Sequence, residues 1–235
     1  MLTKWIWICY GLKKTLLCSY PDSESSTRKT LRNVAIPVNI AVVGISGVGK
    51  SSFINAIRDL TADDEGAAAV GVVETTTEIA SYTHPENCNI KFWDLPGVGT
   101  DKFPQADYLR LISVDQYDFF VVMSASRFFE TDAWLVNEIS RRGKKFVFVR
   151  TKVDVDVRND KKAHPRTNSQ EAVLSEILTS TEEHLKSIGQ SSAELFLIDS
   201  YKREKYDFER LGKKLLCEMP ELKSSVMTKS RCIIS

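Results

Sequence analysis

Short apolar runs alternate with amphipathic stretches over most of the chain. Helical spacing of apolar positions predicts helices near residues 50–60, 104–113, 130–142, 169–188 and 206–218. Buried strands are predicted at Val38–Val43, Ile90–Trp93, Asp118–Met123, Lys145–Val149 and Leu195–Ile198, with an edge strand at Ile79–Thr83. Nearly continuous apolar strands that alternate with helices indicate βαβ units and a mostly parallel sheet. The predicted class is therefore α/β, with helices flanking a central sheet.

The predicted organisation is one folded domain between two short ends. The chain has 235 residues, of which 43% are hydrophobic and 27% charged, as in ordinary globular proteins. Residues 21–33 are polar without an apolar period, and we interpret them as a linker. The folded domain is expected over residues 34–222. No apolar run approaches the roughly 20 residues of a transmembrane helix.

Charge is distributed unevenly along the chain. The net charge is only +1, which gives no reason to expect nucleic acid as a partner. Residues 1–37 carry +4 and residues 221–235 carry +2, so the body between them is acidic. Basic ends suit an anionic membrane surface. The alternative is that both ends are solvated tails.

A glycine-rich segment follows the first predicted strand. Gly44-Ile-Ser-Gly47-Val48-Gly49-Lys50-Ser51 fits the pattern G-x-x-x-x-G-K-[ST], between a strand and a helix. Such a loop turns its N–H groups toward phosphate oxygens at a helix N-terminus. Lys50 is then expected to reach the β- and γ-phosphates and Ser51 to bind Mg²⁺. The alternative is a turn that binds nothing.

A D-x-x-G segment follows the second long strand. Asp94-Leu-Pro-Gly97 lies 44 residues beyond Lys50, at the end of an apolar run. Asp94 at that place can hold the Mg²⁺ shell, and the Gly97 N–H can donate to the γ-phosphate.

A third segment indicates the base. Thr151-Lys152-Val153-Asp154 follows another strand and fits T/N-K-x-D. A carboxylate accepts from both N1–H and the 2-amino group of guanine, whereas adenine would leave it unpaired. The aliphatic stem of Lys152 can cover the base. An ATPase or kinase with the same phosphate loop is therefore disfavoured.

Together these segments resemble the immunity-related (interferon-inducible) GTPase family. The resemblance covers about residues 34–223 and includes EGAAxxGVVExTTE, FWDLPGVGTxxFP and KYDFxxLxxxLxxxMP. It implies a P-loop NTPase with a Ras-like G domain, GTP or GDP with Mg²⁺, and self-association through the nucleotide face or pairing with related GTPases. It also implies a cytoplasmic protein attached peripherally to intracellular membranes in cell-autonomous immunity.

Residue roles carry over by position. The resemblance assigns the phosphates to Gly47, Gly49, Lys50, Ser51 and Ser52. For the Mg²⁺ and γ-phosphate ligand it points to Thr76, with Thr75 and Thr77 as neighbours that are open alternatives. The last base-binding loop resembles LFLIDSYKREKYDF, in which we favour Ser200 beside Asp199. The full set of expected nucleotide-binding residues is Gly44, Gly47, Val48, Gly49, Lys50, Ser51, Ser52, Asp94, Gly97, Thr151, Lys152, Asp154 and Ser200, with Mg²⁺ on Ser51, Thr76 and Asp94.

Two departures bear on catalysis. The family carries a helical domain built from longer extensions, and we expect a short form that lacks most of it. Val98-Gly99 follows Gly97, without the Gln that orients water in Ras-like enzymes. We therefore expect slow hydrolysis that needs a second molecule, with Lys50, Ser51 and Thr76 as catalytic residues. The alternative is a catalytically poor regulator or decoy that binds full-length relatives.

Both ends carry candidate membrane signals. Cys232-Ile-Ile-Ser fits the C-a-a-X prenylation pattern, with basic residues upstream in the tail 223–235. One lipid binds only marginally, so a second signal is needed. Residues 1–20 place Trp, Leu and Lys at amphipathic spacing, with Cys9 and Cys18 open to palmitoylation. The alternative for residues 1–20 is packing on the folded domain.

Overall fold

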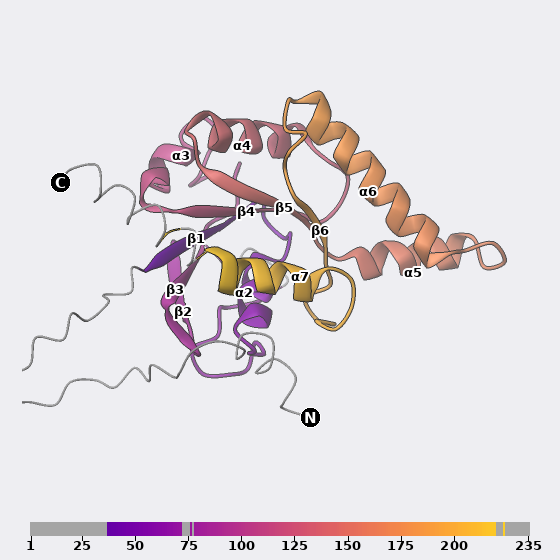
Figure 1. Cartoon of the computed structure of the whole chain (residues 1–235), viewed down its shortest axis with the longest axis horizontal. Helices are drawn as coiled ribbons and strands as arrows, with labels where there is room; N and C mark the ends of the chain where they lie inside the picture. Colours follow the sequence, from indigo (N-terminus) through magenta and orange to yellow (C-terminus); the bar gives the residue numbers. More distant parts are fainter. Residues whose placement is uncertain (1–36, 72–75, 77, 220–222, 224–235) are drawn as a thin grey trace, which may run out of the picture.

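A six-stranded sheet forms the centre of the computed structural model, which describes residues 37–71, 76, 78–219 and 223 (Figure 1). The strands are β1 (Val38–Val43), β2 (Ala80–His84), β3 (Asn87–Asp94), β4 (Phe119–Ser124), β5 (Lys145–Arg150) and β6 (Leu195–Leu197). Their order is β2-β3-β1-β4-β5-β6, and only β2 with β3 is antiparallel. The predicted α/β class with a mostly parallel sheet is confirmed.

Helices cover both faces of this sheet. They are α2 (Lys50–Ile57), α3 (Tyr108–Leu111), α4 (Glu130–Arg141), α5 (Val153–Ala163), α6 (Gln170–Ser187) and α7 (Phe208–Lys213), with a 3-10 turn at Val114–Gln116 and a π-helical turn at Lys214–Glu218. Helices α2 and α7 pack on one face, while α3, α4 and α6 pack on the other (Figure 1). The helix expected over residues 104–113 is shorter than predicted, because turns occupy residues 104–107 before α3 begins.

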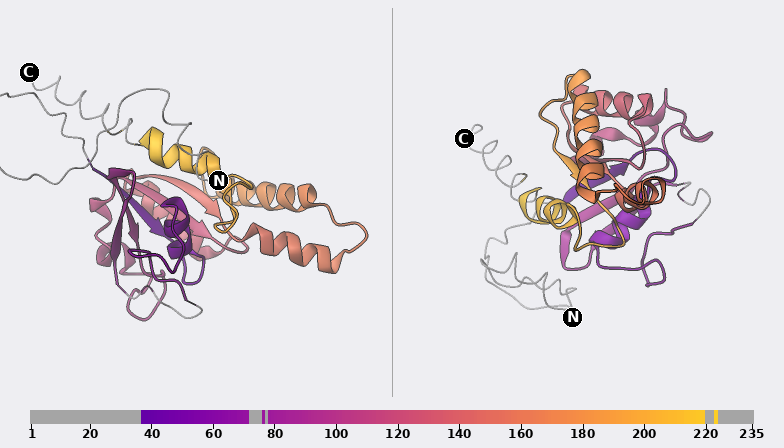
Figure 2. Two further views of the ribbon diagram at one scale, coloured as in Figure 1. Left: turned by 90° about the horizontal axis from the view of Figure 1, so that it is seen from below. Right: turned by 90° about the vertical axis from the view of Figure 1, so that its right-hand side faces the viewer.

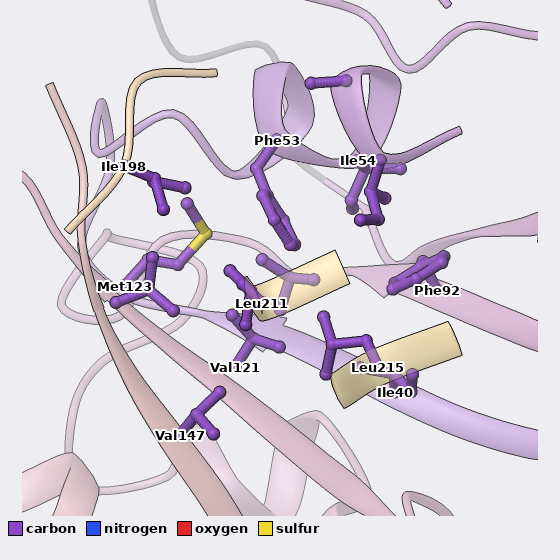
Figure 3. Close-up of a cluster of buried hydrophobic side chains, with 14 of the residues drawn as sticks. Ile40, Phe53, Ile54, Phe92, Val121, Met123, Val147, Ile198, Leu211 and Leu215 are labelled. Carbon is purple, nitrogen blue, oxygen red and sulfur yellow. The ribbon is translucent and has the colours of Figure 1, made fainter. Parts of the chain in front are cut away.

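Strand alternation divides the core into two hydrophobic clusters. Ile40 and Val42 of β1 face α2 and α7, whereas Ala41 and Val43 face the opposite helices. Figure 3 shows the first cluster, in which Phe53 of α2 lies over the sheet. Because the central strands are buried on both faces, the sheet is a rigid base for the loops that leave its carboxyl edge.

Helix α5 is an element that the sequence pattern did not predict. Its sequence VDVDVRNDKKA alternates β-branched and acidic residues like a strand, and of its side chains only Val153 is buried. Two features support the helix. Acidic residues occupy its first turn and Lys161 and Lys162 its last, which suits the helix dipole, and α5 pairs with α6 (Figure 2).

The two expected membrane signals and the expected linker lie outside the described residues. The signals are the segment 1–20 and the tail from residue 224 onward, with Cys232, and the linker is 21–33. Within the described part of the chain, no helix has the length and apolar character needed to cross a membrane.

Candidate functional site

The glycine-rich loop connects β1 to α2 and packs tightly against neighbouring backbone. Gly44 has φ +150°, and a Cβ there would lie 2.2 Å from the Met123 carbonyl oxygen of β4. Gly97 approaches the loop from the other side, where a Cβ would lie 2.6 Å from the Ser46 amide nitrogen. Gly47 and Gly49 also have positive φ, at +79° and +93°. The loop therefore needs glycine for close approach at two places and for backbone conformation at others.

Lys50 begins α2 and folds back over this loop. Its Nζ donates to the carbonyl oxygens of Gly44 at 3.3 Å and Ile45 at 3.1 Å, and the residue is 6% exposed. A buried ammonium beside backbone amides and a helix N-terminus makes a strongly anion-attracting site.

Three side-chain oxygens meet beside the start of α2. The Ser51 hydroxyl donates to Asp94 Oδ2 at 2.5 Å, and the Thr76 hydroxyl donates to the same oxygen at 3.3 Å. Ser51 Oγ and Thr76 Oγ1 are 3.2 Å apart. Asp94 Oδ1 is buried and has no hydrogen-bond partner among the described residues. Mg²⁺ is bound by oxygen ligands such as these hydroxyls and this carboxylate. The unpaired Asp94 Oδ1 could therefore accept a cation, and the group fits Mg²⁺.

Burial dominates the electrostatics of Asp94. Desolvation raises the pKa of its carboxyl above the ordinary value, while hydrogen bonds from Ser51 and Thr76 and the charge of Lys50 oppose that rise. A cation placed at the unpaired oxygen would therefore relieve an unfavourable buried charge. Thr75 and Thr77, the neighbours of Thr76, lie outside the described residues.

The segment leading to Thr76 is held by the far end of α2. Asn55 donates from Nδ2 to the Ala68 carbonyl at 2.8 Å and accepts from the Ala68 N–H at 2.7 Å. Arg58 donates to the carbonyl of Gly66 at 2.9 Å and to that of Thr83 at 3.1 Å. These contacts fix the course of the chain after α2, and Val70 and Gly71 then line the cavity described below.

The segment after β5 closes on the same loop. The Thr151 hydroxyl donates to the Val48 carbonyl at 2.7 Å, and Lys152 Nζ donates to the Gly47 carbonyl at 2.8 Å. Asp154 lies in the first turn of α5 and pairs with Arg158 at 2.7 Å. The side chain of Lys152 therefore crosses to the glycine-rich loop, while Asp154 is held by an ion pair one helical turn away.

These groups surround one cavity of about 530 Å³ at the carboxyl ends of the parallel strands. Twelve expected residues line it: Gly47, Val48, Gly49, Lys50, Ser51, Ser52, Thr76, Gly97, Thr151, Lys152, Asp154 and Ser200. Gly44 and Asp94 do not line it, because Gly44 packs against β4 and Asp94 lies buried beneath Ser51.

Sequence reasoning missed several residues of the cavity wall. Arg158 and Val155 enter from α5, Val70 from the loop after α2, and Tyr201 from the loop after β6. Prediction of α5 as a helix would have revealed Arg158, since it stands four residues after Asp154 on one helical face. Tyr201 belongs to the loop that was expected to bind the base, but the sequence did not single it out from its neighbours.

Comparisons with known proteins identify the family of this chain. The sequence model of the family described as Interferon-inducible GTPase (IIGP) matches residues 22–234. The chain is 41% identical over 223 residues to mouse T-cell-specific guanine nucleotide triphosphate-binding protein 2, covering 92% of this chain and 54% of that protein. It is 42% identical over 183 residues to mouse Interferon-inducible GTPase 1, covering 78% of this chain and 44% of that protein. The chain thus spans about half the length of these curated relatives.

Solved structures share the fold. An NFeoB mutant from S. thermophilus bound to GMPPNP superposes with a TM-score of 0.51 at 16% identity, covering 76% of this chain and 60% of that one. Another NFeoB mutant, bound to GDP and AlF4⁻, gives 0.51 at 17% identity, covering 77% and 64%. The chain therefore has the G-domain fold of P-loop GTPases.

Proposed function

Because the chain belongs to the interferon-inducible GTPase family, we propose that it binds GTP and GDP with Mg²⁺ and hydrolyses GTP to GDP and phosphate. One observation carries the proposal. A single cavity is lined by a glycine-rich phosphate loop, by the hydroxyls of Ser51 and Thr76 above Asp94, and by Lys152 with Asp154.

The phosphate end of this cavity suits a triphosphate. Loop N–H groups and the Lys50 ammonium would bind the β- and γ-phosphate oxygens, and the Gly97 N–H would donate to the γ-phosphate. Ser51, Thr76 and Asp94 would hold Mg²⁺, which supplies charge neutralisation at the phosphate oxygens when bound. The chain's own contribution to hydrolysis is then fixed positive charge and oriented N–H groups rather than a side-chain base.

The base end suits guanine. Asp154 would accept from N1–H and the 2-amino group, and the Lys152 stem would cover one face of the ring. Ser200 lies at the cavity wall beside Asp199, whose carboxylate accepts from the Tyr201 N–H at 2.9 Å. Because the Asp199 carboxylate is already hydrogen-bonded to the loop backbone, Ser200 is the better candidate for contact with the base.

Hydrolysis is proposed to be slow in the monomer and faster on self-association through the nucleotide face. Val98 is apolar and 4% exposed, so no side chain at that place can orient water. Val70 and Val155 are exposed hydrophobic residues that line the cavity. An apolar rim around a polar cavity favours covering by another protein surface, such as a second copy or a related GTPase.

Turnover measured across a hundredfold range of protein concentration tests this proposal, with Lys50→Ala as the control. We expect specific activity to rise with concentration in the wild type. Loss of the Lys50 ammonium should lower turnover by about 10²–10³-fold, the range for one electrostatic group at a developing charge. The same assay with excess ATP should show little competition with GTP.

Two other outcomes would change the assignment. Tight GTP or GDP binding without turnover at any concentration would favour the regulator or decoy that binds full-length relatives. Equal competition by ATP would remove Asp154 as the base-reading residue.

The raised pKa of Asp94 predicts a pH dependence of Mg²⁺ binding. Protonation of this carboxyl competes with the cation, and a raised pKa moves that competition to higher pH than for an ordinary carboxyl near 3.9. We therefore expect the Mg²⁺-dependent gain in GDP affinity to fall as the pH is lowered, and the fall should begin at a higher pH than it would for an ordinary carboxyl. Calorimetric GDP titrations with and without Mg²⁺ at several pH values would measure it. Asp94→Asn should lack both the gain and its pH dependence.

We also propose peripheral attachment to intracellular membranes, in cell-autonomous immunity. Lys223 donates to the Pro37 carbonyl and to Asp118 Oδ2, so the last and first described residues meet where β1 and β4 begin. That edge of the sheet is opposite the cavity. An N-terminal segment and a basic tail that start there can reach one membrane while the cavity faces the cytoplasm.

Cell fractionation of Cys232→Ser tests the lipid part of this proposal. The variant should move from the membrane fraction to the soluble fraction, because one of two required signals is lost. The matched control is Cys217→Ser, which removes a thiol from the folded domain and should leave the distribution unchanged. An unchanged distribution of Cys232→Ser would show that the tail is not an anchor.

A further inference from the structure

Tyr201 is an aromatic residue that the fold holds in the open at the nucleotide cavity. It is 81% exposed, the most exposed of the large hydrophobic residues in the described part of the chain, and it lines the cavity. An aromatic ring gains free energy when it is covered, so a ring left exposed beside a ligand cavity suggests a contact made by the ligand.

The loop that carries Tyr201 is well fixed. Asp199, which is 3% exposed, accepts from the Tyr201 N–H at 2.9 Å. Arg203 donates to the Ala56 carbonyl at the end of α2, and it also pairs with Asp59. The loop is closed at its base, since the Asp207 N–H donates to the Leu197 carbonyl and Asp207 Oδ2 accepts from the Leu197 N–H, each at 2.9 Å. The exposed ring therefore sits on a backbone that has little freedom to withdraw it.

The Tyr201 hydroxyl reaches the start of α2, and it comes from a different loop than Lys152. The Tyr201 hydroxyl lies 3.4 Å from Ser52 Oγ, while Lys152 Nζ reaches the Gly47 carbonyl. Two long side chains, one after β5 and one after β6, thus each meet the phosphate-loop region at their tips. Both residues line the cavity, as do Asp154 and Ser200.

We propose that Tyr201 stacks on the guanine ring, on the side opposite Lys152, and so forms the second wall of the base site. This inference rests on the proposed binding of GTP and GDP. Lys152 and Tyr201 would hold the plane of the base, whereas Asp154 reads its edge. Stacking on a π-face does not distinguish one purine from another, so Tyr201 adds affinity without adding selectivity.

Nucleotide affinities of Tyr201→Ala and Tyr201→Phe test the inference. We expect Tyr201→Ala to bind GDP about ten-fold more weakly, as for loss of one aromatic stack on a base. The affinity of Tyr201→Ala for inosine diphosphate, which keeps the purine ring but lacks the 2-amino group, should fall by the same factor. Tripolyphosphate, which has no base, should compete with equal strength in the variant and the wild type. Tyr201→Phe keeps the ring and should match the wild type for all three probes.

Each contrary outcome has its own meaning. Wild-type affinity of Tyr201→Ala for GDP would overturn the stacking role while leaving guanine nucleotide binding intact. An equal loss of affinity for tripolyphosphate in Tyr201→Ala would also overturn the stacking role, because Tyr201 would then act on the phosphate site through Ser52. Wild-type protein that binds tripolyphosphate but not GDP would instead refute the proposed function.

Discussion

Gly44→Ala is expected to lower the free energy of unfolding by about 3–5 kcal/mol, which combines overpacking with a left-handed backbone cost. The new methyl group would lie 2.2 Å from the Met123 carbonyl oxygen and 3.1 Å from Val48 Cγ2. Met123 belongs to β4, which is hydrogen-bonded on both sides, so its backbone cannot yield. Denaturant unfolding followed by circular dichroism would measure the change.

Gly143→Ala is the matched control for this substitution. Gly143 also has positive φ, at +66°, but a Cβ there meets no atom within 4 Å. We expect a loss of about 1–2 kcal/mol, the backbone cost alone. If the two variants were equally stable, the close approach of Gly44 to β4 would not be a constraint on the phosphate loop.

Asp154→Asn is expected to exchange guanine for xanthine as the preferred base. An amide accepts from N1–H but presents its own N–H to the 2-amino group of guanine, which leaves two donors facing each other. Xanthine has a carbonyl oxygen at that position and complements the amide. The ratio of GDP to XDP affinity should fall by about 10³-fold or more, because a site built on hydrogen bonds rejects the wrong pattern strongly.

Calorimetric titration of both diphosphates would measure this ratio, with Asp160→Asn as the control. Asp160 lies on the same helix, α5, and does not line the cavity. Its substitution should leave the ratio unchanged. An unchanged ratio in Asp154→Asn would mean that its ion pair with Arg158 persists when nucleotide is bound, and that another group reads the base.

Local sequence was enough to predict the strands of the sheet and most of the residues that line its cavity. Runs such as Val38–Val43 are buried on both faces, so composition alone distinguishes them as strands. Gly49, Lys50 and Ser51 come soon after such a strand, so their place at the cavity could be predicted from chain order. Asp94 and Asp154 were recognisable for a similar reason, since Asp94 is the last residue of β3 and Asp154 comes shortly after β5.

Features that depend on contacts between residues distant in sequence could be seen only in the folded protein. Helix α5 forms although its alternating residues resemble a strand, because α6 packs beside it and its charges suit the dipole. Arg158 becomes a cavity residue only through that helix. Tyr201 reaches Ser52 across 149 positions of sequence because Arg203 and Asp207 fix its loop against α2 and β6. Local pattern carries no information on such contacts, because they exist only after the chain has packed.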